Sequence, residues 1–331
     1  MIILGIESSC DETSAAICHE GKIISNVIAT QAVHKSYGGV VPELASRAHQ
    51  ANIIPVVTQA LREANLSINE ISAIAYTQGP GLLGSLLVGS SFAKSLAYAL
   101  QVPTIPIHHM KAHILAHFID DPKPTFPFLC LTVSGGHTQI VRVNSATDMQ
   151  ILGQTQDDAV GEAFDKAAKM LGLPYPGGPL IDQYATAGDP LRFTFSTTQM
   201  PNLDYSFSGI KTSILYFLKK ELALNPAFID ENKADLCASI QHTLVTMLLG
   251  PFLQAAKREG IRQLAIAGGV AANSGLRKEL DKLKAEGFEI FVPKFEYCTD
   301  NAAMIAISGY RYFTEGLIGQ PSDSPMPRMP F

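Results

Sequence analysis

The two halves of this chain open with the same pattern, in which a short apolar run, a polar bend and a second apolar run follow one another. The first copy occupies residues 2–18, with its bend at 7–13, and the second occupies residues 128–143, with its bend at 134–137. Apolar runs separated by short polar bends are typical of paired strands, and a repeat of such a unit indicates duplication. We therefore predict an α/β protein with two similarly built lobes and a cleft between them.

The length supports two lobes, because 331 residues correspond to about two domains and 47% of them are hydrophobic. Periodicity predicts further strands at 23–28, 71–76, 102–107, 264–267 and 290–293, and helices at 47–64, 85–100, 158–172, 206–223, 233–258, 274–286 and 301–315. We expect one lobe to comprise residues 1–108 plus 301–318, and the other to comprise 109–300 with helical insertions. Residues 319–331, rich in Pro and Ser, are expected to form a flexible tail.

Charge and cysteine content exclude several classes of protein. The formal net charge of -5 argues against a protein that coats nucleic acid through a global positive field. The five cysteines show no CxxC spacing, so neither a disulfide framework nor a zinc ribbon is expected. We see neither a basic, apolar leader at the N-terminus nor an uninterrupted apolar stretch of roughly 20 residues, and we predict a cytoplasmic protein without membrane insertion.

A histidine-rich segment gives the strongest local signal for chemistry. His109 and His113 are four residues apart, so on a helix both imidazoles project from one face, as two ligands of a divalent metal require. His117, four residues further on, would lie on the same face. Met110 stands where an HExxH metalloprotease has its glutamate, which disfavours peptide hydrolysis. The alternative is a pair of solvated or core histidines.

A metal site also needs a ligand from elsewhere in the chain. Cys298 and Asp300 lie in a loop just before the last predicted helix. Asp300 could equally be the N-cap of that helix, because an aspartate there accepts hydrogen bonds from the first free backbone N–H groups. From the residues alone both interpretations stay open.

Three glycine-rich bends, at 79–84, 134–138 and 268–273, follow predicted strands. Glycine lets backbone amides approach an anion closely, although any tight turn after a strand can also need it. The Walker A pattern GxxxxGK[ST] is absent from the sequence. Three such bends in two lobes favour an adenine nucleotide bound in the cleft.

Acidic residues supply further candidates. The bend at 7–13 combines Glu7, Asp11 and Glu12 with hydroxyl groups. It could be a solvated turn, or it could bind water, a metal or an incoming nucleophile. Most charge on the helix near 158–166 is expected to be solvated, but Asp165 could reach a ribose.

Taken together, these segments resemble the tRNA adenosine threonylcarbamoyltransferase family, formerly called O-sialoglycoprotein endopeptidases, over about residues 3–315. The resemblance rests on blocks that occur in the family's order: 5–13, 38–43 with Ser46, Arg47 and His49, the signature Lys94, Ser95, Leu100, Gln101, Pro103, Ile105, His109 and 112–114, then 133–138 and 268–273. Lys111 and Ala112 stand where many members have Glu-Gly, but the histidine spacing is kept.

The resemblance implies the two-lobed fold of actin, Hsp70 and the sugar kinases, a duplicated RNase H-like architecture. It implies that His109, His113 and Asp300 bind one divalent metal, Fe²⁺ or Zn²⁺, which favours the ligand interpretation of Asp300. It also implies the residues that hold the adenylate, which are Thr132, Val133, Ser134, Gly135, Gly136, Asp165, Gly178, Asp182 and Asn273.

The implied activity is that of an acyltransferase, N6-L-threonylcarbamoyladenine synthase. Such an enzyme moves the threonylcarbamoyl group from threonylcarbamoyl-AMP to N6 of adenosine 37 in tRNAs that read ANN codons, and AMP leaves. We expect Asp11 or Glu12 to accept the proton. In bacteria the family implies two partners, an inactive paralogous subunit (TsaB type) and a P-loop ATPase (TsaE type), and we expect tRNA to be held jointly with them.

Two other functions share this fold. An actin-like ATPase or small-molecule kinase typically carries Asp-x-Gly-Thr in its first hairpin, whereas residues 7–11 here read Glu-Ser-Ser-Cys-Asp. An inactive paralogous subunit would need no metal ligands. Retention of both histidines and Asp300 favours the active enzyme.

Overall fold

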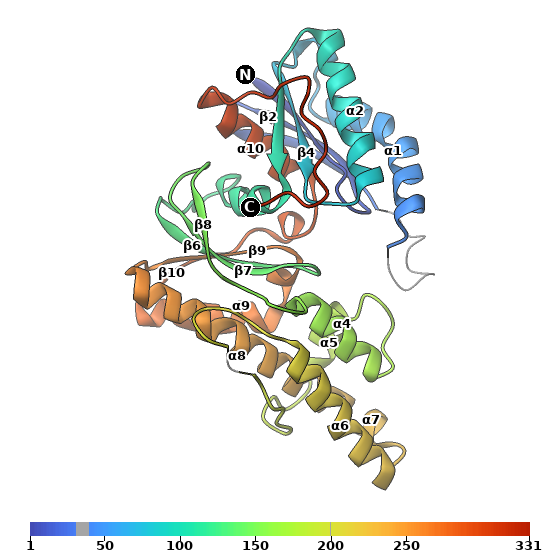
Figure 1. Ribbon diagram of the computed structural model, residues 1–331, viewed down its shortest axis with the longest axis vertical. Helices are drawn as coiled ribbons and strands as arrows, with labels where there is room; N and C mark the ends of the chain where they lie inside the picture. The colour runs from blue at the N-terminus through green and yellow to red at the C-terminus, as the bar shows by residue number, and fades with distance from the viewer. Residues whose placement is uncertain (31–39, 199) are drawn as a thin grey trace. The chain divides into compact units, whose positions relative to one another are not determined.

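Two five-stranded mixed sheets with the same strand order form the framework of the protein (Figure 1). The computed structural model describes residues 1–30, 40–198 and 200–331. These divide into unit 1, comprising Met1–Pro124, Ala146–Asp148 and Pro293–Phe331, and unit 2, comprising Thr125–Ser145 and Met149–Val292. The expected division instead placed residues 109–124 and 293–300 in the second lobe.

The sheet of unit 1 has the order β3 (Lys22–Ala29), β2 (Thr13–His19), β1 (Ile2–Glu7), β4 (Ala73–Gly79) and β5 (Thr104–His108). The first three strands are antiparallel, and β4 and β5 continue parallel to β1. Its helices are α1 (Pro42–Glu63), α2 (Leu83–Leu100), α3 (His109–Leu115) and α10 (Ala302–Thr314), and its 3₁₀ turns are Ile68–Glu70, Ala116–Phe118 and Phe295–Tyr297.

The sheet of unit 2 repeats this plan with β8 (Met149–Gln154), β7 (Thr138–Val143), β6 (Phe128–Val133), β9 (Gln263–Ala267) and β10 (Glu289–Phe291). Directions repeat as well, since β6, β7 and β8 are antiparallel and β9 and β10 are parallel to β6. Its helices are α4 (Val160–Met170), α5 (Gly178–Ala185), α6 (Ser208–Leu224), α7 (Phe228–Glu231), α8 (Lys233–Glu259) and α9 (Ser274–Lys282), with 3₁₀ turns at Gly269–Ala272 and Leu283–Glu286. The predicted duplication and α/β fold are confirmed.

The alternation of side chains along β1 divides the core of unit 1 into two layers. Leu4 and Ile6 belong to a buried cluster with apolar residues of α1 and α2. Gly5 points the other way, toward α10, which lies on the opposite face of the sheet (Figure 1). A Cβ on Gly5 would lie 2.6 Å from the backbone nitrogen of Ala306, so only glycine allows α10 to pack this closely on β1.

Residues 319–331, expected as a flexible tail, hydrogen-bond to the rest of unit 1. The amide of Met326 donates to the carbonyl of Gln78 (2.8 Å), and Gln78 Nε2 donates to the carbonyl of Ser324 (3.0 Å). The Phe331 ring packs edge-on against His108, the residue before α3. The end of the chain is therefore tied to β4 and to the start of α3.

Two helices, α2 and α8, are long and apolar enough to cross a membrane by length and composition. In α8, 61% of the most apolar 18-residue segment is buried, and the helix contacts α5, α9 and α4. Burial of this extent is typical of the core helix of a globular unit. In α2, the buried positions of the helix include Leu86, Ala93 and Ala97, and the last two belong to the cluster with β1 and β4.

Candidate metal centre

Three elements of unit 1 bring the candidate ligands together. The first two ligands lie on α3, which starts directly after β5, so His109 and His113 occupy successive turns of one helix face. Asp300 lies two residues before α10. Because α10 packs directly on β1, its N-terminal end brings Asp300 close to the end of β1 and to α3.

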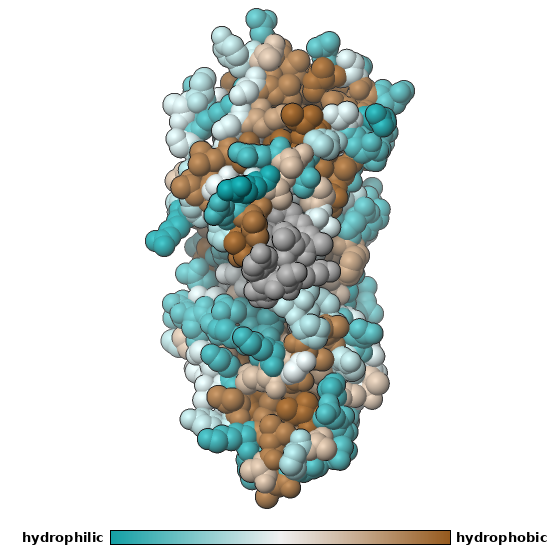
Figure 2. All heavy atoms as spheres, turned by 90° about the vertical axis from the view of Figure 1, so that its right-hand side faces the viewer, coloured by the Kyte–Doolittle hydropathy of each residue, from teal (hydrophilic) through white to brown (hydrophobic). Residues whose placement is uncertain are grey.

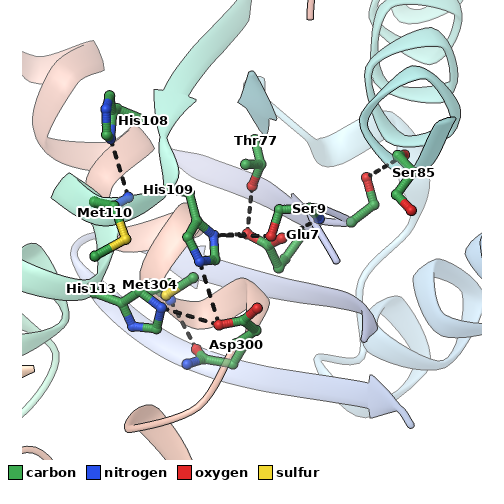
Figure 3. A network of polar contacts seen from close by, with 12 residues as sticks. Glu7, Ser9, Thr77, Ser85, His108, His109, Met110, His113, Asp300 and Met304 are labelled. Atoms are coloured by element: carbon green, nitrogen blue, oxygen red, sulfur yellow. Dashed lines mark hydrogen bonds and ion pairs between the residues drawn. The ribbon is translucent and has the colours of Figure 1, made fainter. Parts of the chain in front are cut away.

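The ligand atoms converge on one point (Figure 3). Asp300 Oδ1 lies 3.1 Å from His113 Nε2 and 3.4 Å from His109 Nε2, and the three residues' ligand atoms all lie within 4.8 Å of one another. His113 and His109 are almost fully buried, whereas the Asp300 side chain is 25% exposed. Among the described residues this is the group of His, Cys, Asp and Glu that could hold an ion.

The structure also settles which residue caps α10. The cap is Asn301, whose Oδ1 accepts a hydrogen bond from the amide of Met304 (3.0 Å), so Asp300 faces the imidazoles instead. The other two candidate ligands, His117 and Cys298, lie outside the group formed by His109, His113 and Asp300. His117 falls in the turn after α3, and the Sγ of Cys298 lies near the carbonyl of Lys294.

Glu7 is a functional residue whose role the sequence did not reveal. Its fully buried carboxylate accepts a hydrogen bond from His109 Nδ1–H through Oε2 (3.1 Å) and one from Thr77 Oγ1 (2.6 Å) (Figure 3). The amide of Ser9 donates to the other oxygen. A carboxylate on Nδ1 fixes the tautomer, so that Nε2 of His109 faces the other ligands. The available signal was a glutamate at the end of an apolar strand, where a buried charge needs a partner.

The charges in the centre shift one another's pKa values. Burial alone would raise the pKa of Asp300, but the imidazoles of His109 and His113 outweigh it and lower the pKa. Burial would likewise raise the pKa of Glu7, but His109 lowers it. The pKa of His109 is raised well above its ordinary value, because the carboxylates of Asp300 and Glu7 outweigh the effect of burial. A cation bound by this group would take the place of the proton that the raised pKa of His109 favours.

The acidic bend after β1 adds negative charge beside the centre. Burial, followed by the charges of Asp300 and Asp11, raises the pKa of Glu12 to about 9. Burial and then Asp11 also raise the pKa of the Cys10 thiol, which makes that thiol a poor nucleophile. A cation in the centre would relieve this repulsion.

The residues fit a divalent transition metal. Ligand atoms that each lie about 2.0–2.2 Å from one ion are roughly 3–4 Å apart, as the two Asp300 distances are. Two imidazoles and a carboxylate leave further coordination positions open, which is the donor set of catalytic zinc and non-haem iron sites. The arrangement can therefore hold an ion that also contacts a substrate.

The expected adenylate residues all lie in unit 2. Thr132 and Val133 end β6, and the amide of Ser134 already donates to the carbonyl of His137 (2.8 Å). A Cβ built on Gly135 or Gly136 would meet no described atom within 4 Å, so the tip of this bend is open.

The other expected adenylate residues also hold the backbone of unit 2 in place. Asp165 accepts hydrogen bonds from the amides of Gly177 (2.8 Å) and Gly178 (3.1 Å) at the start of α5. Asp182 accepts hydrogen bonds from the amide and hydroxyl of Ser274. Asn273 caps α9 through the amide of Leu276 and donates to Gln241. The sequence did not predict these structural roles.

Comparisons with known proteins find a matching family model and close relatives of the sequence. A family model described as tRNA N6-adenosine threonylcarbamoyltransferase matches residues 22–307. A protein of that name from Cytophaga hutchinsonii is 58% identical over 328 residues, covering 99% of this chain and 96% of the relative. One from Porphyromonas gingivalis is 57% identical over 322 residues, covering 96% of this chain and 94% of the relative.

The segment 38–43, one of the blocks on which the resemblance rests, begins with Gly38 and Gly39, and these two residues lie outside the described residues.

Solved structures of distant sequence share the fold. HypF of T. kodakarensis matches with a TM-score of 0.63 and 14% identity, covering 98% of this chain and 49% of HypF. Component A of the (R)-2-hydroxyglutaryl-CoA dehydratase of Acidaminococcus fermentans matches with a TM-score of 0.54 and 16% identity, covering 96% and 99%. These likenesses show the actin-like fold and nothing about activity.

Proposed function

The chain belongs to the tRNA N6-adenosine threonylcarbamoyltransferase family, a family of transferases, and from this premise we propose that it makes threonylcarbamoyladenosine in tRNA. The proposed donor is threonylcarbamoyl-AMP and the acceptor is N6 of adenosine 37 in tRNAs that read ANN codons. The observation that carries the proposal is the convergence of His109, His113 and Asp300 in a chain of this family.

The reaction needs positioning more than covalent catalysis. The donor is a mixed anhydride, so its carbonyl is already activated. The exocyclic amine attacks it, a C–N bond forms, the C–O bond to phosphate breaks, and AMP leaves. A protein can accelerate such a step by orienting the reactants and stabilising charge. The candidate metal ligands of unit 1 and the backbone amides of the bend after β6 in unit 2 are groups of the kind that such a reaction needs.

We assign the chain's residues as follows. His109, His113 and Asp300 would hold one Fe²⁺ or Zn²⁺, which when bound supplies Lewis acidity for the donor's oxygens. The backbone amides of Gly135 and Gly136, at the open tip of the bend, would receive phosphate, and the rest of 132–134 with Asp165, Gly178, Asp182 and Asn273 would position the adenylate. Asp11, or Glu12 once a bound cation has lowered its raised pKa, would take the proton released by the amine.

The proposed partners are an inactive paralogous subunit and a P-loop ATPase. An exposed apolar surface supports a protein partner, since Ile54 on α1 and Leu83, Leu87 and Tyr98 on α2 are 45–88% exposed. Hydrophobic residues gather over the upper part of the view in Figure 2, where α1 and α2 lie. All five cysteines are free, which agrees with the proposed cytoplasmic location.

Transfer of label tests the function directly. The chain, supplied with Fe²⁺ or Zn²⁺ and the two partners, is incubated with threonylcarbamoyl-AMP labelled in its threonine and with unmodified tRNA. We expect label in nucleoside 37, one AMP per label, and no label in a tRNA with guanosine at position 37. Absence of transfer, together with phosphorylation of a sugar or of acetate from ATP, would instead establish the kinase alternative.

A further inference from the structure

The exposed face of α6 carries a stripe of lysines around a tyrosine. The helix buries Ile210, Ile214 and Leu218 and turns its opposite face outward. At helical spacing that outer face presents Lys211, Leu215, Tyr216, Lys219 and Lys220. Tyr216 is 67% exposed and Leu215 is 49% exposed. The lower part of the view in Figure 2, where α6 and α7 lie, shows hydrophobic atoms flanked by hydrophilic ones.

This helix is held firmly, so the stripe has a fixed orientation. Phe217 packs against Phe193, Phe195 and Phe228, with ring centroids 5.3–5.9 Å apart. At the start of α6 the carboxylate of Asp157 accepts hydrogen bonds from the hydroxyls of Ser206 and Ser208 and the amide of Phe207. The exposed tyrosine therefore belongs to an ordered helix.

The charge of the stripe is positive in a chain that is negative overall. The helix has three lysines and one acidic residue, Glu221, which gives it a formal charge of 3 - 1 = +2, whereas the whole chain carries -5. Lys220 lies 4.0 Å from Glu221. Within the described residues, Lys211 and Lys219 lie within 4.0 Å of no carboxylate. Cations without protein partners are available to bind an anion.

We propose that this face of α6 is a tRNA-binding surface, an inference that rests on the proposed function. Lys211 and Lys219 are eight residues apart, which is about 12 Å along a helix axis, so the two lysines can contact two different phosphates of one strand. Tyr216 lies one turn from Lys219 and Lys220 and offers a ring on which an unstacked base can lie. Alternating cations and an exposed aromatic ring form the pattern that binds single-stranded or looped RNA.

The test compares two triple variants of the full chain, each assayed with its metal and partners. The first, called the α6 variant, combines Lys211→Gln, Lys219→Gln and Lys220→Gln. The matched control combines Lys278→Gln, Lys282→Gln and Lys284→Gln at α9 and the turn after it, where Lys282 and Lys284 already pair with Glu279 and Asp281. We expect the α6 variant to raise KM for tRNA on the order of tenfold or more, with kcat, KM for the donor and metal content unchanged.

Two further readouts identify the groups that bind the RNA. The slope of log affinity against log salt should fall by about 0.7–0.9 for each phosphate that the variant no longer neutralises, and it should stay constant in the control. Tyr216→Ala should weaken tRNA binding on the order of tenfold, while Tyr216→Phe retains it, because stacking needs the ring and not the hydroxyl.

Three outcomes would overturn the inference. The first is a wild-type KM for tRNA in both the triple lysine variant and Tyr216→Ala, and the second is an equal loss of tRNA affinity in the α9 control. The third is that the α6 variant no longer assembles with the partner proteins but keeps its affinity for tRNA. Failure of the proposed function is separate, because it appears as absent transfer by the wild type. In that case fluorescence anisotropy with the same tRNA still shows whether α6 binds it.

Discussion

At the scale of single residues, Glu7 orients one imidazole of the candidate metal centre. Its carboxylate accepts the Nδ1 proton of His109, so Nε2 is directed at the point shared with His113 and Asp300. Glu7→Gln keeps the shape but removes the charge. Loss of such an orienting carboxylate typically weakens metal binding 10–100-fold, and we expect a fall in Zn²⁺ affinity of about that size.

Competition with a chromophoric chelator measures this affinity without any assay of transfer. Glu63→Gln, at an exposed position on α1, is the control and should bind Zn²⁺ as the wild type does. If Glu7→Gln binds the ion with unchanged affinity, Glu7 does not orient the ligand and its hydrogen bond to His109 has another role.

Glu12 makes the metal-free chain less stable at high pH. Its pKa is raised from 4.5 to about 9 in the folded state, so the folded chain keeps a proton there that the unfolded chain loses. The free energy of unfolding therefore falls as pH rises between these two values. Glu12→Gln removes this loss and should stabilise the metal-free protein by more at pH 8 than at pH 5, with a difference on the order of 1–3 kcal/mol.

Urea denaturation in the presence of a chelator at both pH values measures the difference. Glu286→Gln, an exposed substitution in unit 2, should change stability equally at the two pH values. A Glu12→Gln variant whose stability relative to the wild type does not depend on pH would show that Glu12 is ionised in the folded chain.

The sequence predicted that the candidate ligands lie together, but not what surrounds them. The spacing of His109 and His113 is local, so it could be read directly, and the resemblance favoured Asp300. Glu7 and His109 are 102 positions apart in the sequence, and their contact depends on how β1 lies beside α3. The hydrogen bonds of Asp165 and Asp182 to backbone amides depend in the same way on the paths of two loops.

At the scale of elements, strong periodicity was reliable and weak signals were missed. The bounds predicted for β6 and β7 match the structure. The strand β8 was not predicted, because it is an edge strand with only one fully buried residue and little alternation. The helix α5 was not among the predicted helices, although Pro179 in its first turn is compatible with a helix start.

The packing of α10 on β1 leads to a prediction for Gly5. In Gly5→Ala the new methyl group would lie 2.6 Å from the backbone nitrogen of Ala306, and backbone atoms cannot move aside as a flexible side chain can. We expect a loss of roughly 1–3 kcal/mol in the free energy of unfolding, together with weaker Zn²⁺ binding, because a shifted α10 displaces Asp300.

Gly250→Ala in α8 is the matched control, because a methyl group there meets no described atom within 4 Å. Alanine is a better helix former than glycine, so this variant should be about 0.5–1 kcal/mol more stable than the wild type and bind Zn²⁺ normally. Equal stability of the two variants in urea would contradict the close packing of α10 on β1.

At the scale of the whole molecule, the duplication assigns different tasks to equivalent positions. The bend after β1 in unit 1 contributes Glu7, Asp11 and Glu12, whereas the bend after β6 in unit 2 contributes open glycines. The same strand pair thus carries a proposed cation-binding end in unit 1 and a proposed anion-binding end in unit 2. Sequence alone indicated the repeat, whereas the proposal of which bend binds which charge rests on burial and hydrogen bonding.

The overall charge predicts how strongly the isolated chain binds tRNA. With 30 acidic and 25 basic side chains, its global field repels a polyanion, and the +2 charge of α6 attracts one only locally. We therefore expect the chain alone to bind tRNA in the range of about 10⁻⁴ to 10⁻⁶ M at physiological salt, as in non-specific binding, and its partners to tighten binding tenfold or more. Fluorescence anisotropy with a tRNA transcript, at two salt concentrations and with and without the partners, measures both values, and an unstructured RNA of equal length is the control. A nanomolar, salt-sensitive complex formed by the chain alone would mean that its surface binds tRNA without help, and would contradict joint binding.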